Sequence, residues 1–258
     1  MYSVDLNSDL GESFGAYKIG RDEDVIPLVS SANVACGFHA GDPTVMAKTT
    51  ALCKENGIAM GAHPGFNDLV GFGRRNMSVA PSDIKSMIIY QVGALDAFCK
   101  ATGIKMQHVK PHGALYNMAA KDAALASAIC EGIYEYNPEL ILMGLANSEM
   151  INQAKKLGLP YAAEVFADRA YEDDGTLVAR TKPGAMIKDE TEAVSRVVGM
   201  IKNHSVTSVN GNEIEICPDS VCVHGDSEKA LIFVKKIRDT LQKEGIAIKP
   251  VCEIISER

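Results

Sequence analysis

Short apolar runs rich in β-branched residues alternate along this chain with longer segments whose apolar positions recur every three or four residues. This alternation is typical of repeated βα units, which build a parallel sheet. Strands are expected at 2–7, 32–36, 58–61, 107–109, 140–143, 161–165, 220–223 and 247–251. Seven or eight such strands fit a barrel, and the 258 residues suit one barrel and contain no Ser/Gly linker. We therefore expect a single (β/α) barrel domain over 1–258.

Capping residues mark most of the expected helices. Caps or stops stand at Asp42–Pro43 and Gly57, at Pro81 and Gly103, at Asp189 with Glu192, and at Asp226 and Gly245. Two further helices are expected near 122–136 and 148–157. A hairpin of 206–209 with 213–216 is also expected, because the Asn210–Gly211 step favours a tight turn.

Charge and cysteine content restrict the class of protein. The 26 basic and 33 acidic residues give a net charge of −7, which argues against a nucleic-acid binder. The seven cysteines contain no C-x-x-C pair, which is typical of reduced thiols. The N-terminus has no basic start or apolar core of a secretory signal, and the longest uncharged stretch, 25–41, is too short and polar to span a bilayer. We expect a cytoplasmic protein without nucleic-acid or membrane partners.

Polar side chains suited to chemistry follow the expected strands, at or near their carboxyl ends. In a parallel barrel these ends converge on one face, where such enzymes have their active sites. The candidate residues are Asn7, Asp9, Asn33, His39, His63, Arg74, Lys110, His112, Asp168, Arg169, His224 and Asp226. Their convergence, rather than any single motif, predicts an active site.

Asp5, Asn7 and Asp9 alternate at a period of two, so on an extended strand they share one side, which would be the interior of the barrel at its mouth. Burying acidic groups there is costly unless they bind something. The alternative is that Asp9 and Glu12 cap a turn facing solvent.

The histidines divide into two groups. His39, His63, His112 and His224 follow strands, and although each alone could be a loop histidine bonded to backbone, four on one face indicate a site. His108 lies inside a strand pattern and His204 near a helix end, so both are interpreted as structural.

Three positions offer cations to an anionic ligand. Lys110 and Arg169 are candidates for binding a phosphate or a carboxylate, and Arg74–Arg75 in a glycine-rich loop could reach the same anion. The alternative is that Asp168 and Arg169 only pair with their neighbours.

Nucleotide, nucleophile and metal motifs are missing or incomplete. No G-x-x-x-x-G-K-[ST] motif occurs, and Gly71–Gly73 lacks the third glycine of a dinucleotide fingerprint. The segment Gly11–Gly15 matches G-x-S-x-G but does not join a strand to a helix as a nucleophile elbow does. His and Asp at a barrel mouth suit zinc or a similar divalent ion, yet no H-x-x-x-H or H-E-x-x-H helix is present, so metal ligands stay unassigned.

The candidate segments together resemble the LamB/YcsF family over nearly the whole chain. The resemblance rests on six motifs in order: VDLNSDLGESFG, SANVACGFHAGDP, GAHPGFNDLVGFGRR, VKPHGALYN, EVFADRAYEDDGTLVAR and VCVHGD. Small departures at Ser8 and Val34 touch no candidate chemical group. The resemblance implies a (β/α)₇ barrel of the glycoside hydrolase/deacetylase type. It also implies the A subunit of an ATP-dependent 5-oxoprolinase, which acts with B and C subunits to convert 5-oxo-L-proline, ATP and water into L-glutamate, ADP and phosphate.

This reaction needs a base for water, an acid for the ring nitrogen and cations for anionic groups, each acid or base contributing roughly 10²- to 10⁴-fold. Our hypothesis gives the base role to Asp9 or His63 and the acid role to His112 or His224. The remaining assignments are Asp168 as a further catalytic residue, and Asn7, Asn33, His39, Arg74, Lys110, Arg169 and Asp226 as substrate-binding residues. ATP is consumed by the complex, and the missing nucleotide motif favours a hydrolytic rather than a kinase-like role for this chain.

Two other functions stay open at this point. One is a metal-dependent carbohydrate or amide deacetylase, which the His/Asp-rich mouth would also suit. The other is a ligand-binding or regulatory barrel without catalytic activity.

Overall fold

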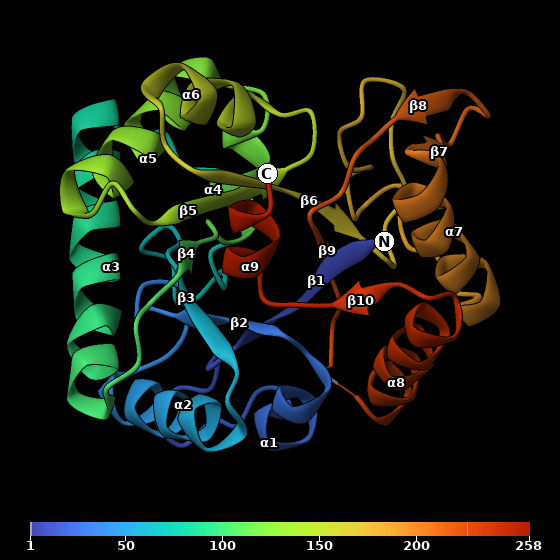
Figure 1. Cartoon of the computed structure of the whole chain (residues 1–258). Helices are drawn as coiled ribbons and strands as arrows, with labels where there is room; N and C mark the ends of the chain where they lie inside the picture. The colour runs from blue at the N-terminus through green and yellow to red at the C-terminus, as the bar shows by residue number, and fades with distance from the viewer. Residues whose placement is uncertain (1, 226) are drawn as a thin grey trace.

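Seven parallel strands form a closed barrel at the centre of the protein (Figure 1). The structure, a computed structural model, describes residues 2–225 and 227–258. The barrel order is β1 (Ser3–Leu10), β2 (Ser31–Ala35), β3 (Ala59–His63), β4 (His108–Val109), β5 (Ile141–Leu145), β6 (Tyr161–Phe166) and β9 (Ser220–Cys222). Pairing of Asp5 with Ser220 and of Asn7 with Cys222 joins β9 to β1 and closes the barrel. The expected (β/α)₇ barrel is confirmed.

Helices surround the barrel, and most begin and end where the sequence predicts. The long ones are α2 (Pro43–Asn56), α3 (Pro81–Thr102), α5 (Ala123–Tyr136), α6 (Glu149–Leu157), α7 (Glu190–Asn203) and α8 (Glu228–Lys243). Asp42 caps α2 by accepting from two backbone N–H groups, and Gly57 ends it in the left-handed conformation, at φ 66°. Asp189 likewise caps α7 through the N–H of Glu192. Capping chemistry therefore locates these helices well.

The cap of α8 differs from the expected one. Its N-cap is Ser227, whose hydroxyl accepts from the N–H of Ala230 at 3.2 Å. The prediction that Asp226 caps this helix is therefore wrong, and Asp226 itself lies outside the described residues. Short helices that the sequence did not reveal are α1 (Asp22–Val25), η1 (Ile26–Leu28) and α4 (Gly113–Ala119).

The strand expected at 247–251 does not belong to the barrel. Only β10 (Ala247–Ile248) is extended, and it pairs with Ser3 and Val4 at the start of β1. From Asp5 to Asn7, the same edge of β1 pairs with β9 instead. After Pro250 the chain turns into α9 (Val251–Ser256), because proline fixes its φ angle and favours a helix start.

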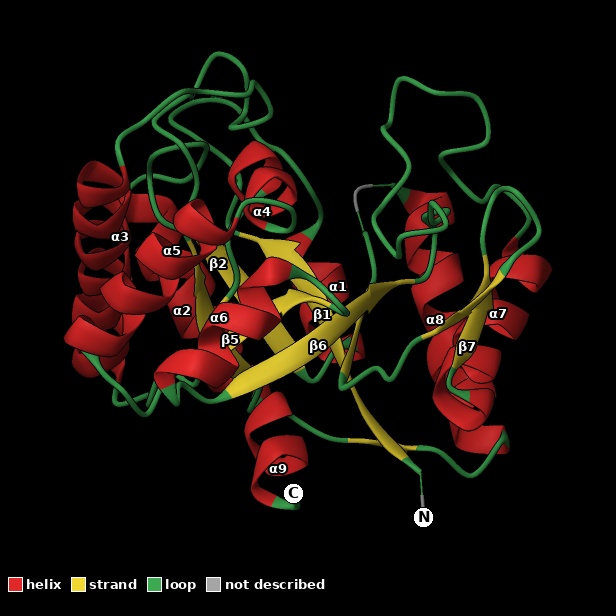
Figure 2. Cartoon of the chain, turned by 90° about the horizontal axis from the view of Figure 1, so that it is seen from above, coloured by secondary structure: helices red, strands yellow, loops and turns green. Residues whose placement is uncertain are grey.

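The two ends of the barrel differ. At the amino end, α9 packs Val251 against Ile141, Met143 and Ala162 in a small apolar cluster. The loops gather on the opposite side, as Figure 2 shows. The predicted hairpin is confirmed as β7 (Ser205–Thr207) with β8 (Glu213–Glu215), which lies beside α7 outside the barrel. Among the described helices, none combines the length and apolar composition needed to span a bilayer.

Candidate active site

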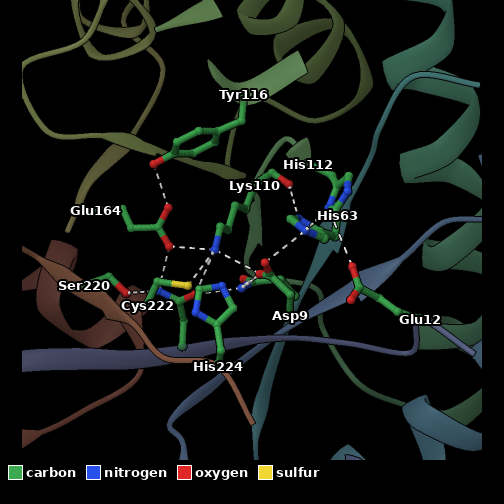
Figure 3. A network of polar contacts seen from close by, with 12 residues as sticks. Asp9, Glu12, His63, Lys110, His112, Tyr116, Glu164, Ser220, Cys222 and His224 are labelled. Atoms are coloured by element: carbon green, nitrogen blue, oxygen red, sulfur yellow. Dashed lines mark hydrogen bonds and ion pairs between the residues drawn. The ribbon is translucent and has the colours of Figure 1, made fainter. Parts of the chain in front are cut away.

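Lys110 occupies the centre of a buried polar network inside the barrel mouth (Figure 3). Its ammonium nitrogen lies 2.9 Å from Asp9 Oδ1, 2.7 Å from Glu164 Oε1, 3.2 Å from Asn7 Oδ1 and 3.2 Å from Cys222 Sγ. Burial alone would lower the pKa of Lys110, but these neighbours, Asp9 first, raise it well above its usual value. Lys110 is therefore a fixed cation, engaged by two carboxylates of the protein rather than held ready for a substrate anion.

Three side chains of β1 point into the barrel, as their period of two predicts. The deepest, Asp5, accepts hydrogen bonds from the hydroxyls of Ser30, Ser31 and Ser220. Burial raises the pKa of Asp5 to about 6. Asn7 donates to Glu164 Oε1 at 3.0 Å. Asp9 is nearest the mouth and lies within the strand, which runs on to Leu10, rather than in a solvent-facing turn.

Asp9 is held as a carboxylate. Its Oδ1 accepts from Lys110 and, at 2.8 Å, from Asn33 Nδ2, while its Oδ2 lies 3.4 Å from His63 Nε2. Burial would raise the pKa of Asp9, but the charges of His63 and Lys110 lower it well below its usual value. An ionised acid that also contacts an imidazole can accept or relay a proton.

The imidazole rings of His63 and His112 face each other through two nitrogens that have no donor between them when both rings are neutral. His63 Nδ1 lies 2.7 Å from the carbonyl oxygen of Lys110, and His112 Nε2 lies 2.8 Å from that of Phe72. A carbonyl only accepts, so both of these nitrogens carry hydrogen, and in the neutral rings the other two are lone-pair nitrogens. Those two, His63 Nε2 and His112 Nδ1, are 2.9 Å apart. A proton or a metal ion between them is required to make this contact attractive.

Glu12 and His39 extend this cluster. Glu12 Oε1 lies 3.2 Å from His39 Nε2 and 3.6 Å from His112 Nδ1, and the rings of His39 and His112 stack at 3.6 Å. One ligand atom from each of Glu12, His39, His63 and His112 lies within 4.8 Å of the others. Tetrahedral zinc with Zn–N bonds near 2.0–2.1 Å separates its ligands by about 3.3 Å, so the group has the composition and spacing of a metal site.

The predicted substrate contact of His39 is not supported by the structure. Its side chain is 1% exposed and does not line the mouth cavity. Glu12, for which the sequence indicates only a turn role, does line the cavity. Which of His39 and Glu12 reaches the cavity depends on how their side chains pack, and the sequence pattern does not reveal this.

Glu164, Tyr116 and Cys222 are site residues that the sequence analysis missed. Glu164 is fully buried in β6 and accepts from the Tyr116 hydroxyl at 2.7 Å (Figure 3). A single acid inside the apolar segment 161–166 was the available signal. Tyr116 lies on α4, which was not predicted, so its approach to Glu164 could not be foreseen.

His224 and Asp168 form a pair next to Asp9, because one ligand atom of each of Asp9, Cys222 and His224 lies within 4.8 Å of the others. His224 Nδ1 lies 3.0 Å from Asp168 Oδ2. Burial would lower the pKa of His224, but the charge and hydrogen bond of Asp168 raise it above its usual value. This favours a protonated imidazole, which suits an acid.

A cavity of about 660 Å³ opens at the mouth and brings most predicted residues together. This volume is typical of small-molecule sites. Its lining includes Asp9, His63, Arg74, Lys110, His112, Arg169, Arg180 and His224. Asn7 and Asn33 lie beneath it, where they orient Lys110 and Asp9, and Asp168 supports His224 from behind. Asp226, also predicted to bind substrate, is outside the described residues.

His108 has the structural role predicted for it. It is fully buried in β4, and its Nε2 lies 2.7 Å from Asn33 Oδ1. His204 ends α7 in the left-handed conformation, with φ at 54°. Arg75 pairs with Asp68 outside the cavity, whereas Arg74 lies over the Phe72 ring.

Comparisons with known proteins agree with these features. The chain is 66% identical over 254 residues to the A subunit of 5-oxoprolinase from Clostridium beijerinckii, covering 98% of this chain and 100% of the relative. A protein of the same name from Campylobacter jejuni is 60% identical over 248 residues, covering 96% and 97%.

A crystal structure of a lactam utilization protein from Thermus thermophilus superposes with a TM-score of 0.91 at 42% identity, covering 96% of this chain and 99% of that one. Residues 4–256 match the LamB/YcsF family as a whole. With these matches along its full length, the chain belongs to the LamB/YcsF family.

Proposed function

We propose that this chain is the hydrolytic component of an ATP-dependent 5-oxoprolinase, which opens the ring of 5-oxo-L-proline to give L-glutamate. The observation that carries the proposal is the 66% identity to the A subunit of a 5-oxoprolinase over the full length of that protein. The mouth supports it, because an ionised acid, paired histidines and arginines line one cavity. The B and C subunits would supply phosphoryl transfer from ATP.

The chemistry explains why these groups are needed. A five-membered lactam is a poor electrophile until its oxygen is phosphorylated. Water then adds to the ring carbon and loses a proton, the C–N bond breaks as the nitrogen gains a proton, and the acyl phosphate that remains is hydrolysed to glutamate and phosphate. Asp9 with His63 would take the proton from water, and His224 would give one to the ring nitrogen.

The sequence predicts that Lys110 binds the substrate, because it follows a strand. We propose a different role for it. Because Asp9 and Glu164 already engage its ammonium group, it would act by keeping Asp9 ionised and fixed in place. Arg169 and Arg74 remain as cations for anionic parts of the substrate. In the part of the chain that the structure describes, all seven cysteines are free, which supports a reducing cytoplasm for the complex.

Reconstitution tests the proposal. The chain is mixed with folded candidate B and C subunits, and glutamate release from 5-oxoproline is measured with and without ATP. ATP-dependent release is expected, and its absence would overturn the assignment. If the complex keeps full activity after substitutions at Asp9 and His112, the barrel binds or regulates rather than catalyses.

A metal-dependent amide hydrolase is the second candidate function. The facing lone pairs of His63 and His112, with Glu12 nearby, favour it, because a divalent ion would fill the space between them and could activate water. Metal analysis separates the two functions. A stoichiometric transition metal together with chelator-sensitive hydrolysis that needs no ATP would favour the second candidate.

A further inference from the structure

The mouth cavity carries a pair of arginines whose joint role lies beyond the proton transfers of the proposed reaction. We propose that Arg169 and Arg180 bind a phosphate group, so that this chain receives the lactam in its phosphorylated form. The inference rests on the proposed function and adds the class of ligand that its active site takes. Both side chains line the cavity that Asp9, His63 and His224 also line.

Arg169 is a buried cation that no carboxylate contacts directly among the described residues, although the charge of Asp168 acts on it from farther away. Its side chain is 4% exposed, its Nη2 donates to the carbonyl of Val178 at 2.7 Å, and its buried Nε has no hydrogen-bond partner. Among the described residues, no carboxylate oxygen lies within 4.0 Å of its guanidinium group. Burying a charge without a contacting counter-ion is expensive, so an anion from outside the chain would stabilise this site.

Arg180 adds a second positive charge at the same place. Burial, and next the charge of Arg180, lower the pKa of Arg169 to about 10. The Arg180 guanidinium contacts the sulfur of Met186 at 3.7 Å, and no ion pair joins Arg180 to a described acid. Two like charges that repel each other in a partly dry site are stabilised together by one anion that contacts both.

Backbone pairing holds the segment that ends at Arg180 against the segment that begins at Arg169 before any ligand binds. The N–H of Val178 donates to the carbonyl of Ala170 at 3.0 Å, and Arg169 bridges to Met186 in an antiparallel arrangement. These contacts fold 178–180 back against 169–170. The segment is therefore ordered around the pair, which lowers the entropic cost of binding a ligand there.

Phosphate fits the pair better than a carboxylate does. Both lysines of the cavity have carboxylate partners: Lys110 contacts Asp9 and Glu164, and Lys121 forms an exposed ion pair with Asp174 at 3.7 Å. The pair then presents two positive charges, which matches a phosphate group of about −1.5 to −2 rather than a single carboxylate charge.

The acids of the cavity orient the phosphorylated substrate. Asp9 and Glu12 repel a phosphate from their side of the cavity, so the phosphate lies toward the arginines and the ring carbon toward Asp9. Arg74, which also lines the cavity and pairs with no described acid, is left for the substrate carboxylate.

Direct binding to the isolated full chain tests this site. Inorganic phosphate is titrated by calorimetry and by ³¹P NMR against wild type, Arg169→Gln, Arg180→Gln and, as a matched control, Arg75→Gln. Arg75 is an exposed arginine paired with Asp68 outside the cavity. Each cavity variant is expected to weaken phosphate binding roughly tenfold or more, and the control to leave it unchanged. Because Arg180 is exposed, its variant keeps the test valid even if Arg169→Gln folds poorly.

Two results would overturn the phosphate site. One is wild-type phosphate affinity in Arg180→Gln. The other is a loss of 5-oxoproline binding in the cavity variants while phosphate binding is kept, which would make the pair a carboxylate site. Glutamate release by the reconstituted complex is measured in parallel. If the wild-type complex releases glutamate but the variants bind phosphate normally, only the arginine phosphate site is refuted. If the wild-type complex releases no glutamate in the presence of ATP, the proposed function is refuted.

Discussion

At the scale of single residues, the site is organised by charge placed out of contact with bulk water. Lys110 and Glu164 are almost completely buried, and Asp9 is mostly so. Charges in such surroundings are tolerated only when each has close partners, and removing one partner leaves the others uncompensated. The network therefore couples the stability of the barrel to the protonation of the groups that we propose to be catalytic.

Lys110→Met is expected to lower the free energy of unfolding by roughly 3–5 kcal/mol, because Asp9 and Glu164 would lose their shared cation. The matched control is Lys105→Met, which removes an exposed pair with Glu139 and should cost less than about 1 kcal/mol. Urea unfolding of both variants measures the difference. Equal losses would mean that the buried network contributes no more than a surface pair.

Asp9→Asn and His224→Ala are each expected to lower the turnover of the reconstituted complex by roughly 10²- to 10⁴-fold, since each removes a proposed proton-transfer group. His204→Ala, at the far end of α7, serves as the control and should turn over normally. Glutamate release at saturating ATP is the measurement, with circular dichroism to verify folding. Near wild-type turnover in both folded variants would refute these roles.

The pKa of His224 offers a direct electrostatic test. Asp168→Asn should lower it, because the raised value depends on the Asp168 charge and hydrogen bond. Since the folded-state pKa is raised, the pair stabilises the protein fully below about pH 6.5, and this stabilisation is lost as pH rises through the folded value. Titration of the His224 ring by NMR in both proteins measures the shift. An unchanged pKa would show that Asp168 does not set the charge of His224.

Sequence patterns identified the residues at the strand ends better than those within the barrel. Asp9, His63 and His112 could be predicted because the carboxyl ends of parallel strands share one face. Glu164 could not be predicted, since the sequence does not show whether a single acidic side chain in an apolar strand points into the barrel or away from it. His39 follows an expected strand, as the other candidate histidines do, but its ring stacks on that of His112 and does not line the cavity.

At the scale of elements, close approach between neighbouring strands shapes the barrel interior. Gly61 on β3 pairs with His108 on β4, and a Cβ atom at Gly61 would lie 2.4 Å from the His108 ring. His108 in turn contacts Asn33, which donates to Asp9. The absence of a side chain at Gly61 thus keeps His108 in position under the site.

Gly61→Ala is expected to destabilise the protein by about 1–3 kcal/mol, because His108 would have to move within a packed interior. Gly199→Ala is the control. Gly199 lies in α7 with nothing within 4 Å of an added Cβ, so this change should stabilise by about 0.5–1 kcal/mol. Thermal unfolding measures both effects. A Gly61→Ala protein as stable as wild type would contradict the packing argument.

Elements with strong local signals were predictable, and those that depend on tertiary contacts were not. The first residues of helices such as α2 and α7 can be predicted, because an aspartate side chain caps each of them. Helix α4 spans only 7 residues and has no side-chain cap, so nothing local distinguishes it from a loop. The segment 247–251 has strand composition, but β9 takes most of the edge that it would need on β1.

At the scale of the whole molecule, closure of the barrel brings distant segments to one mouth. Pairing of β1 with both β2 and β9 places Asp9 near residues that are more than a hundred positions away, including Lys110 and His224. The sequence indicated this convergence through the repeated βα pattern. It did not indicate which strands would close the ring, because that choice depends on the packing of the complete barrel.

The helix α9 beneath the barrel has a kinetic consequence. Val251 of α9 packs against Ile141, Met143 and Ala162 at the amino end, and the cavity opens at the mouth, so we expect substrate and product to use the same opening. Glutamate must then leave before the next lactam enters, and its release competes with substrate arrival. In the reconstituted complex, added glutamate should raise the KM for 5-oxoproline without lowering kcat, and initial-rate measurements would reveal this. Noncompetitive inhibition would instead mean that glutamate also binds the complex while 5-oxoproline occupies the cavity, so that the two do not share one site.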